Sequence, residues 1–460
     1  MALIKSISGI RGTIGGKPGE SLSPIDVVKF TSAYGQLALS NGNKKIVIGR
    51  DGRISGPSIS KLVAETLTAL GADVIDLGLS TTPTVEMEVI HEKAAGGIII
   101  TASHNPKDWN ALKLLNEKGE FISAEIGAQI LKMAEQGEIQ FAPVDKLGNI
   151  AEKFNHADFH LDSIVNYPLV DKKAIEKRKF KIVVDAINSS GAIFVPALLK
   201  KLGLSDDQII VLNDEVNGKF AHNPEPLPQH LNQLASEVVN HKADLGISVD
   251  PDVDRLVLVS EDGSMFGEEY TLVAVADYML SKRKGNTVSN LSSSRALKDI
   301  TEKHGGSYYP AAVGEVNVVA KMKEVNAIIG GEGNGGIIVP DFHYGRDALI
   351  GIALVLSLLA ASKKTAKQLR NSYPDYFISK NKIELENGID LSGIFLKIQQ
   401  KYKSNPLNTI DGLRIEFDND WVHLRASNTE PIIRIIAESN FETTANNIAT
   451  KLIKDIQECI

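Results

Sequence analysis

The chain has 460 residues, of which 43% are hydrophobic and 23% charged, and its formal net charge at pH 7 is −7. This length is enough for about three or four domains, and the composition is typical of a soluble globular protein. The small acidic excess disfavours a nucleic-acid-binding protein, because such proteins present a basic surface to the phosphate backbone.

Cysteine usage and apolar runs predict where the protein resides. The single cysteine, Cys459, rules out a disulfide framework and a cysteine-based zinc site. The first residues lack the apolar segment of a signal peptide, and the longest apolar run, 348–361, is too short to span a bilayer. We therefore expect a cytoplasmic protein that does not bind membranes.

Apolar periodicity divides residues 1–155 into alternating strands and helices. The predicted elements are strands at 45–49, 74–77 and 97–101 and helices at 58–70 and 84–91. This βαβαβ order predicts a largely parallel sheet. Ser103 follows the last of these strands, and ligands of open α/β sheets bind at that edge.

Two further units follow along the chain, and the first of them repeats this order of strands and helices. The second unit is predicted to contain strands at 181–185, 209–212 and 245–249 and helices at 192–202 and 227–241. The third is predicted to contain a hairpin at 256–260 and 264–266, a strand at 327–329 and helices at 269–280, 316–323 and 348–361. Each unit includes a strand that ends in a polar loop, which indicates a repeat of fold rather than of residues.

Beyond about residue 371 the pattern changes. The predicted elements are strands at 382–385, 413–417 and 421–425 and helices at 394–402 and 443–456. Strands and helices in this order predict a smaller α+β domain.

Three aspartates, Asp250, Asp252 and Asp254, follow the strand at 245–249. On an extended backbone, residues i, i+2 and i+4 project to one face, where three carboxylates repel one another unless a cation lies between them. Oxygen ligands suit Mg²⁺ or Ca²⁺, and an open coordination side favours Mg²⁺ with phosphate chemistry. A solvated acidic turn is the simpler alternative. An EF-hand loop is disfavoured, because Arg255 stands where that loop needs glycine.

A second polar segment has the composition of a phosphate-binding loop. It reads Arg425-Ala426-Ser427-Asn428-Thr429-Glu430-Pro431 and is followed by Arg434. Guanidinium groups, hydroxyls, an amide and successive backbone N–H groups are the usual ligands of a phosphate. The alternative is a capped turn beside two surface arginines. The flanking arginines favour the phosphate site.

The glycine-rich segment 330–336 formally matches a dinucleotide-binding fingerprint, but no helix with a ribose-binding acid follows it. We interpret it as a loop that approaches a ligand closely and presents Glu332 and Asn334 to hydroxyl groups. The chain has no P-loop motif, which disfavours a nucleoside triphosphate substrate. It also has no Gly-x-Ser-x-Gly elbow, so a hydrolase triad has no support.

Other polar residues near the predicted strand ends are less informative. Arg11 and Arg53 each lie in a turn with glycine, where a structural role is the ordinary interpretation. His104 follows Ser103, but adjacent residues at a strand end point apart, so His104 is not assumed to be its base. Together, the serine, the aspartates and the phosphate loop indicate phosphoryl transfer through the serine, with Mg²⁺ dispersing the charge.

On these motifs the chain resembles the α-D-phosphohexomutase family along nearly its whole length. The motifs are 101–106, 250–255, 331–336 and 425–431, in the family's order, together with 8–12. The resemblance implies an α/β fold of four domains around a central cleft: three similar βαβ-type domains with mixed sheets and a smaller C-terminal α+β domain. The expected domains are 1–155 with the phosphoserine, 156–256 with the metal site, 257–370 for sugar recognition and 371–460 for phosphate binding.

The resemblance also implies roles for individual residues. The expected Mg²⁺ ligands are the phosphoserine Ser103 and Asp250, Asp252 and Asp254. The expected catalytic residues near the transferred phosphoryl group are Ser103, His104, Arg11 and Lys113. The expected sugar-binding residues are Arg255, Gly314, Glu315, Glu332 and Asn334. The expected ligands of the distal phosphate are Arg425, Ser427, Asn428, Thr429 and Arg434.

The implied activity interconverts a hexose 6-phosphate and a hexose 1-phosphate through a hexose 1,6-bisphosphate, which also serves as activator. Val313-Gly314-Glu315 favours glucosamine phosphate, whereas Asn428 favours glucose or mannose phosphate, and we place glucosamine first. Two positions depart from the family pattern. Gly336 stands where many members have histidine, so His343 or Arg346 is a candidate for the acid–base role, and Ala111 replaces a usual glycine.

Two other functions are compatible with parts of the pattern. A Mg²⁺-dependent sugar phosphatase would let water attack the phosphoserine, but it would not need the phosphate-binding loop. A sugar-phosphate-binding protein without activity would not need to keep the serine and all three aspartates, and all four are present.

Overall fold

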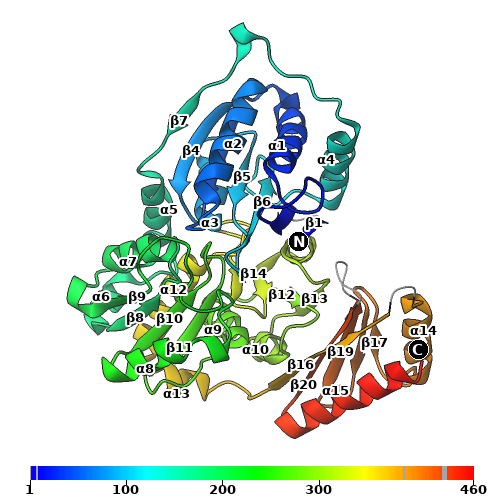
Figure 1. Cartoon of the computed structure of the whole chain (residues 1–460). Helices are drawn as coiled ribbons and strands as arrows, with labels where there is room; N and C mark the ends of the chain where they lie inside the picture. The colour runs from blue at the N-terminus through cyan, green and yellow to red at the C-terminus, as the bar shows by residue number, and fades with distance from the viewer. Residues whose placement is uncertain (1, 7–8, 387–388, 427–431, 460) are drawn as a thin grey trace. The chain divides into compact units, whose positions relative to one another are not determined.

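The computed structural model of the protein describes residues 2–6, 9–386, 389–426 and 432–459. The chain forms two compact units, one of Met1–Tyr278 with Asn334–Arg370 and one of Met279–Gly333 with Asn371–Ile460 (Figure 1). Across the described residues, no helix is both long enough and apolar enough to cross a membrane.

A seven-stranded mixed sheet organises the N-terminal part of the first unit (Figure 1). In spatial order its strands are β1 (Leu3–Ser6), β2 (Gly9–Thr13), β6 (Trp109–Leu115), β5 (Gly96–Ile100), β3 (Lys45–Arg50), β4 (Asp73–Leu79) and β7 (Ile150–Glu152). Strands β5, β3, β4 and β7 run parallel, and β6, β2 and β1 add antiparallel pairs. The predicted βαβαβ segment is therefore parallel, and the antiparallel strands make the whole sheet mixed.

Helices cover both faces of this sheet. They are α1 (Pro24–Ala38), α2 (Gly56–Ala69), α3 (Thr82–His91) and α4 (Ala124–Gln136), and α1 continues into the 3-10 turn η1 (Leu39–Asn41). Ile98 and Ile100 of β5 point to the core that includes α1, α2 and α4, whereas Ile99 points to the core that includes α3. A strand buried on both faces needs an unbroken apolar run, which explains the isoleucine triplet before Ser103.

The rest of the first unit is built on a second sheet. In spatial order its strands are β11 (Leu256–Ser260), β10 (Leu245–Val249), β8 (Ile182–Asp185) and β9 (Ile209–Leu212), with β11 antiparallel to the others. Its helices are α5 (His156–Val165), α6 (Lys172–Arg178), α7 (Gly191–Lys201), α8 (Asn232–Asn240), α12 (Ala348–Ser362) and α13 (Ala366–Arg370), and the short strand β15 (Gly336–Ile338) precedes α12. The 3-10 turns η3 (Asp206–Gln208) and η4 (Pro228–His230) lie in its connections, whereas η2 (Val144–Lys146) precedes β7 of the first sheet. Helix α12 packs against α5, α6 and α7, which fits its apolar sequence.

Two predicted elements of this region are wrong in extent. The helix predicted at 227–241 divides into the turn η4 and α8, because Leu231 between them has φ −103° and ψ 17°. The second strand of the predicted hairpin is reduced to one bridge, Val259 with Met265.

The second unit contains a parallel sheet and a separate antiparallel sheet. The parallel strands are β13 (Tyr308–Ala311), β12 (Asn286–Asn290) and β14 (Ala327–Glu332), with helices α10 (Ala296–Lys303) and α11 (Glu315–Glu324). The helix α9 (Glu268–Lys282) contains the boundary between the two units.

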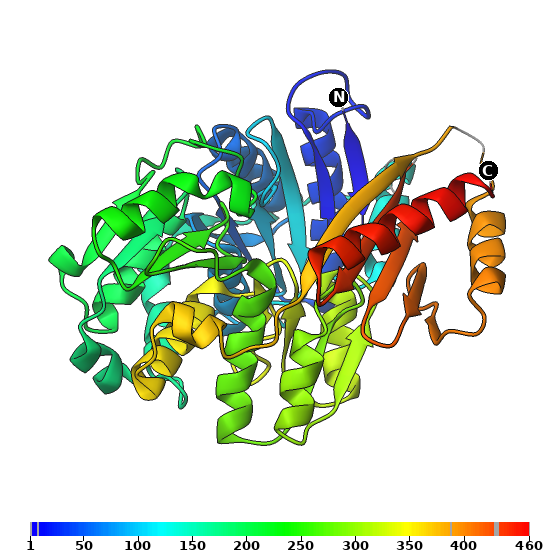
Figure 2. The same cartoon turned by 90° about the horizontal axis from the view of Figure 1, so that it is seen from below.

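The antiparallel sheet forms the C-terminal part of the second unit. In spatial order its strands are β16 (Phe377–Glu384), β20 (Ile432–Ser439), β19 (Trp421–Ala426), β18 (Leu413–Glu416) and β17 (Leu407–Asn408). The helix α15 (Glu442–Gln457) runs along β16 and β20 (Figure 2), and α14 (Leu391–Lys401) packs against α15. Strand β20 has no counterpart among the predicted elements, although it pairs with both β16 and β19.

His222 contributes a pH-dependent ion pair to the first unit. Its Nε2 lies 2.7 Å from Asp185 Oδ2 at the end of β8. Burial lowers the pKa of His222, but the Asp185 carboxylate outweighs burial, and the net pKa is raised. Because the pKa of His222 is higher in the folded than in the unfolded protein, protonation of His222 stabilises the fold. This stabilisation is complete below the unfolded-state pKa of about 6.5 and is lost as the pH rises through the folded-state pKa.

We expect the melting temperature of His222→Gln to lie below that of the wild type at about pH 6 and to approach it at about pH 9. The effect should be small, a few tenths of a kcal/mol to about 1 kcal/mol, because the pair is partly exposed to solvent. Thermal unfolding followed by circular dichroism measures the difference. A difference of the same size at both pH values would contradict the ion pair.

Candidate active site

Ser103 lies in a tight turn beyond the end of β5. The strand stops at Ile100, and Ser103 has a left-handed φ of 49° and is buried. Its Oγ donates a hydrogen bond to Asp250 Oδ2 at 2.6 Å and lies 3.4 Å from His104 Nδ1. The expectation that Ser103 and His104 point apart is therefore wrong, because these residues follow the strand and are not part of it.

The His104 ring is held in a cationic environment. Burial and the positive charges of Arg255 and Arg11 lower the pKa of His104 well below its usual value. Arg11, on β2, donates from NH1 to Asn105 Oδ1 at 2.8 Å, and burial and Arg255 lower the pKa of Arg11. Arg11 and His104 thus both belong to the surroundings of the Ser103 turn.

Arg53 fixes the backbone of the same turn. Its guanidinium donates to Asp51 Oδ2 through Nε at 3.1 Å. The remaining donors reach four backbone carbonyls at 2.5–2.9 Å, those of Ser103, Asn105, Pro106 and Trp109.

The glycine-containing turn around Arg53 predicts only a structural role, and its link to Ser103 emerges from the structure. The available signal was its position directly after β3, at the same edge of the sheet as the turn after β5. A buried arginine at that edge can donate hydrogen bonds to few acceptors other than the backbone carbonyls of the neighbouring turn.

The three aspartates converge at the end of β10. One carboxylate oxygen from each of Asp250, Asp252 and Asp254 lies within 4.8 Å of the others, and all three residues are buried. The backbone is not extended as predicted, because Val253 between them has a φ of 62° and the segment folds into a turn. The convergence is nevertheless achieved, with Asp250 Oδ1 accepting the backbone N–H groups of Asp254 and Arg255.

Cationic side chains surround these carboxylates. Lys113 Nζ lies 2.6 Å from Asp252 Oδ2 and 3.2 Å from Asp254 Oδ2. Arg346 NH2 lies 2.7 Å from Asp254 Oδ2. Burial alone would raise the pKa of Asp252, but Lys113 outweighs burial and lowers it. Thr82 Oγ1, at the start of α3, also donates to Asp252 Oδ2 at 2.5 Å.

The aspartates fit a divalent cation such as Mg²⁺. Asp252 Oδ1 and Asp254 Oδ1 are buried and have no hydrogen-bond partner among the described residues. Burial and the neighbouring Asp254 and Asp252 carboxylates raise the pKa of Asp250 well above its usual value. A hard dication would satisfy the two oxygens and relieve the repulsion between the carboxylates.

Arg346 occupies the space beside Gly336. A Cβ atom added at Gly336 would collide with Arg346 Cδ, so a larger residue at 336 would displace the arginine. His343, the other candidate for an acid–base role, lies 3.3 Å from both Glu86 and Asp347. Burial would lower the pKa of His343, but these carboxylates outweigh it and raise the pKa to about 9. Of these two candidates for the acid–base role, Arg346 is the one that forms an ion pair with one of the three aspartates, Asp254.

The predicted sugar-binding residues fall into two groups. Glu332 Oε1, at the end of β14, accepts hydrogen bonds from Asn290 Nδ2 at 3.0 Å and from the Gly314 N–H at 3.1 Å. Glu315 follows at the first position of α11. The second unit thus brings Glu332, Gly314 and Glu315 together.

Arg255 and Asn334 belong to the first unit. Arg255 NH1 lies 3.6 Å from Glu225 Oε1. Asn334 Oδ1 accepts the N–H of Gly336, so this oxygen stabilises its own turn.

Two arginines predicted to bind the distal phosphate are neighbours in the C-terminal sheet. Arg425 on β19 pairs directly with Arg434 on β20, so both side chains lie on one face. Arg425 Nε lies 2.8 Å from Asp411 Oδ2, which orients the guanidinium. The other three predicted ligands, Ser427, Asn428 and Thr429, lie outside the described residues.

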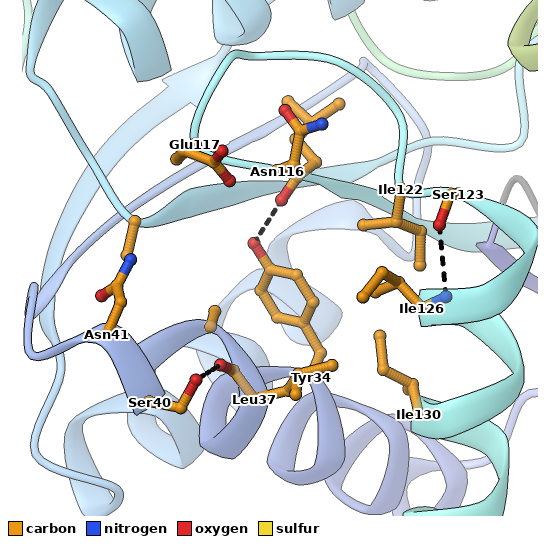
Figure 3. A pocket seen from close by; sticks show the side chains of 13 residues that line it. Tyr34, Leu37, Ser40, Asn41, Asn116, Glu117, Ile122, Ser123, Ile126 and Ile130 are labelled. Atoms are coloured by element: carbon orange, nitrogen blue, oxygen red, sulfur yellow. Dashed lines mark hydrogen bonds between the residues drawn. The ribbon is translucent and has the colours of Figure 1, made fainter.

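A pocket of about 350 Å³ in the first unit is separate from these residues (Figure 3). Tyr34, Ile122, Ile126 and Ile130 line it, and Tyr34 donates a hydrogen bond to the Leu115 carbonyl. The pocket lies at the start of β5 and the end of β6, at the sheet edge opposite Ser103.

Four family models cover most of the chain in the order of the observed sheets. They describe phosphoglucomutase/phosphomannomutase domain I at residues 3–140, domain II at 158–263, domain III at 267–376 and the C-terminal domain at 382–454. The chain belongs to the α-D-phosphohexomutase family. It is accordingly a phosphohexomutase, an isomerase with an α/β fold of four domains.

Relatives and solved structures agree with this assignment. A phosphoglucomutase/phosphomannomutase of Thermococcus kodakarensis is 34% identical, with 98% of each chain covered. A phosphoglucosamine/phosphogalactosamine mutase of Sulfurisphaera tokodaii is 32% identical, with 99% of this chain and 100% of the relative covered. The crystal structure of a Burkholderia thailandensis family protein superposes with a TM-score of 0.85 at 25% identity, covering 99% and 98% of the two chains.

A more distant solved structure shows the same fold. The Aspergillus fumigatus N-acetylphosphoglucosamine mutase, solved with GlcNAc-6P and magnesium, has a TM-score of 0.63 at 16% identity. The alignment covers 100% of this chain and 96% of that one.

We expect Arg53→Lys to lower the kcat of this phosphohexomutase about 100-fold with a smaller change in KM. Lysine has three donors in place of the five N–H groups of arginine, so turn carbonyls lose their partners and Ser103 shifts. The folded protein should also lose about 2–4 kcal/mol of stability. Steady-state kinetics and urea unfolding measure both effects.

Arg50→Lys is the matched control, because Arg50 lies in the same segment and donates from Nη1 to the Asp51 carbonyl at 3.1 Å, away from the carbonyls of the Ser103 turn that Arg53 binds. Its effect on kcat should be small. Equal losses in the two variants would show that the turn does not depend on Arg53.

Proposed function

We propose that this phosphohexomutase interconverts glucosamine 6-phosphate and glucosamine 1-phosphate, with Ser103 as the residue that carries the phosphoryl group. The observation that supports this proposal best is the buried hydrogen bond of 2.6 Å from Ser103 Oγ to Asp250 Oδ2. It couples a single hydroxyl to three convergent carboxylates, which is the arrangement required by a metal-assisted phosphoryl donor.

Asp250, Asp252 and Asp254 would hold Mg²⁺ together with an oxygen of phosphorylated Ser103. When bound, Mg²⁺ disperses the negative charge that the transferred phosphoryl group develops. Lys113 and Arg346 keep Asp252 and Asp254 in position through ion pairs of 2.6–3.2 Å.

The proposed reaction has two phosphoryl transfers. In the first, the bond from Ser103 Oγ to phosphorus breaks and a bond forms from phosphorus to O1 of the hexose 6-phosphate, which gives up its hydroxyl proton. The resulting 1,6-bisphosphate reorients, the bond from O6 to phosphorus breaks as Ser103 Oγ bonds to that phosphorus, and O6 takes up a proton, which leaves the 1-phosphate. Arg11 and His104 lie beside the Ser103 turn and are assigned to the charge of the phosphoryl group.

The second unit supplies the remaining proposed contacts. Glu332, with the neighbouring Gly314 and Glu315, is assigned to the sugar hydroxyl groups. Arg425 and Arg434, with residues 427–429, are assigned to the phosphate that is not transferred. Binding energy from this remote phosphate would orient the sugar for reaction.

The names of the relatives support glucosamine phosphate as the sugar. Relatives from Methanopyrus kandleri and Pyrococcus abyssi, 30% and 32% identical, are named probable phosphoglucosamine mutases. The second candidate is glucose or mannose phosphate, because the relative from Thermococcus kodakarensis at 34% identity is named phosphoglucomutase/phosphomannomutase. Asn428 also favours this second candidate.

We expect Ser103→Ala to lose at least about 1,000-fold in turnover while its melting temperature stays close to that of the wild type. The intact mass of active wild-type protein should include one phosphoryl group, mapped by proteolysis to the peptide that contains Ser103. Ser123→Ala is the control, because Ser123 caps α4 away from the aspartates and its loss should leave activity unchanged.

Activity retained by Ser103→Ala, or a phosphoryl group mapped to another residue, would overturn the proposed mechanism. Neither result would affect the family assignment.

Among glucosamine, glucose, mannose and N-acetylglucosamine 6-phosphates, we expect the highest kcat/KM for glucosamine 6-phosphate. The assay contains Mg²⁺ and a trace of the matching bisphosphate, and phosphorus NMR resolves the 1-phosphate from the 6-phosphate. A preference for glucose or mannose phosphate would select the second candidate. Release of inorganic phosphate as fast as isomerisation would instead indicate a phosphatase.

A further inference from the structure

A second cluster of metal-ligating side chains lies in the first unit, apart from the aspartates of the active site. It consists of His160 on α5, His343, and Asp347, which precedes α12, and all three are buried. His160 Nε2 lies 2.9 Å and His343 Nε2 lies 3.3 Å from Asp347 Oδ2. The two imidazole rings are nearly perpendicular, at 89°. The rings therefore approach the same carboxylate oxygen in different orientations.

These three atoms have the spacing of ligands around one small cation. In a tetrahedral zinc site, ligands about 2.0–2.1 Å from the metal lie about 3.3 Å from one another. Of the two observed separations from Asp347 Oδ2, that of His343 Nε2 equals this value at 3.3 Å and that of His160 Nε2 is shorter, at 2.9 Å. The other oxygen of Asp347, Oδ1, accepts the N–H groups of Leu349 and Ile350, which fixes the carboxylate and directs Oδ2 toward the rings.

The Nδ1 atom of each imidazole ring also has a polar neighbour. His160 Nδ1 lies 2.9 Å from Thr84 Oγ1, and His343 Nδ1 lies 3.3 Å from Glu86 Oε2. Histidines that bind a metal through Nε2 usually present Nδ1–H to a carboxylate, a carbonyl or water, which sets their tautomer and orientation. Thr84 and Glu86 both lie on α3, so one helix contacts both rings, with a hydrogen bond to His160 and an ion-pair contact to His343.

We propose that His160, His343 and Asp347 bind one divalent transition-metal ion, with Zn²⁺ as the best match and water as the fourth ligand. Imidazole nitrogens select zinc and its neighbours, whereas the oxygen ligands of Asp250, Asp252 and Asp254 select Mg²⁺. The two sites therefore differ in the metal they prefer. Both histidines would bind through Nε2 as neutral imidazoles, and the metal would displace the Nε2 proton that His343 carries in the metal-free protein.

The ion would have a structural role and would not contact the substrate. It would cross-link α5 to the segment before α12, with α3 as the support of both histidines. Arg346 directly precedes Asp347 and pairs with Asp254, so fixing Asp347 also limits the movement of Arg346. This inference does not depend on which sugar phosphate is the substrate.

The test measures zinc in the full-length protein. Protein is stripped with a chelator, incubated with excess Mg²⁺ and one equivalent of Zn²⁺, and separated from free metal by gel filtration. We expect about one Zn²⁺ per chain in the wild type and at least about a tenfold loss in His160→Gln and His343→Gln. With Co²⁺ as the probe, the wild type should show the strong visible absorption of tetrahedral cobalt, and both variants should lack it.

Two control variants identify the site of binding. His91→Gln alters a partly exposed cluster with Glu88 and Glu92 and should keep the zinc. Asp252→Asn removes an oxygen ligand of the active-site triad and should also keep it. Loss of zinc in Asp252→Asn with retention in His343→Gln would place the ion at the aspartates and overturn the proposal.

Crystals of the wild type give an answer that does not depend on the folding of any variant. After a zinc soak, an anomalous difference peak at the zinc edge is expected between His160 Nε2, His343 Nε2 and Asp347 Oδ2. A peak at the three aspartates alone, or no peak at all, would overturn the proposal and leave the cluster as a network of hydrogen bonds.

Discussion

The buried guanidinium of Arg53 is the constraint on which the Ser103 turn depends. A buried charge is tolerated only when its donors are paired, because an uncompensated one costs several kcal/mol. Arg53 meets this requirement with the Asp51 carboxylate and with four carbonyls of the segment 103–109. The left-handed conformation of Ser103 is thereby held before any substrate binds, and such preorganisation would lower the barrier to the phosphoryl transfer proposed at Ser103.

A second constraint is the balance of charge around the aspartates. Three buried carboxylates need cations, and Lys113 and Arg346 supply two of them beside the proposed Mg²⁺ site. Arg346 reaches Asp254 across the position of Gly336, where a side chain would block it. A side chain at 336 would therefore displace Arg346 from its ion pair with Asp254.

Much of the fold could be predicted from the sequence, because apolar periodicity is a local signal. The strands 45–49, 209–212 and 245–249 occur within one residue of their predicted ends. Prediction was wrong where backbone geometry departs from regular structure. The segment 250–254 turns at Val253 instead of continuing as a strand, and Ser103 brings its Oγ toward His104 by leaving β5. Strand β20 was missed, although its pairing on both sides makes it central to the C-terminal sheet.

The sequence by itself determined the family and the class of reaction, and it predicted Ser103 and the three aspartates as the candidate site, because these features are short motifs whose spacing is read along the chain. Only the tertiary structure decided which distant side chains hold these residues, and the buried carboxylate of Asp347, in position. Arg53 acts on carbonyls some fifty residues away, Lys113 on aspartates about 140 residues away, and His160 on a carboxylate 187 residues away. Such contacts arise when separate strands end at one sheet edge or separate helices meet, and no local pattern encodes that meeting.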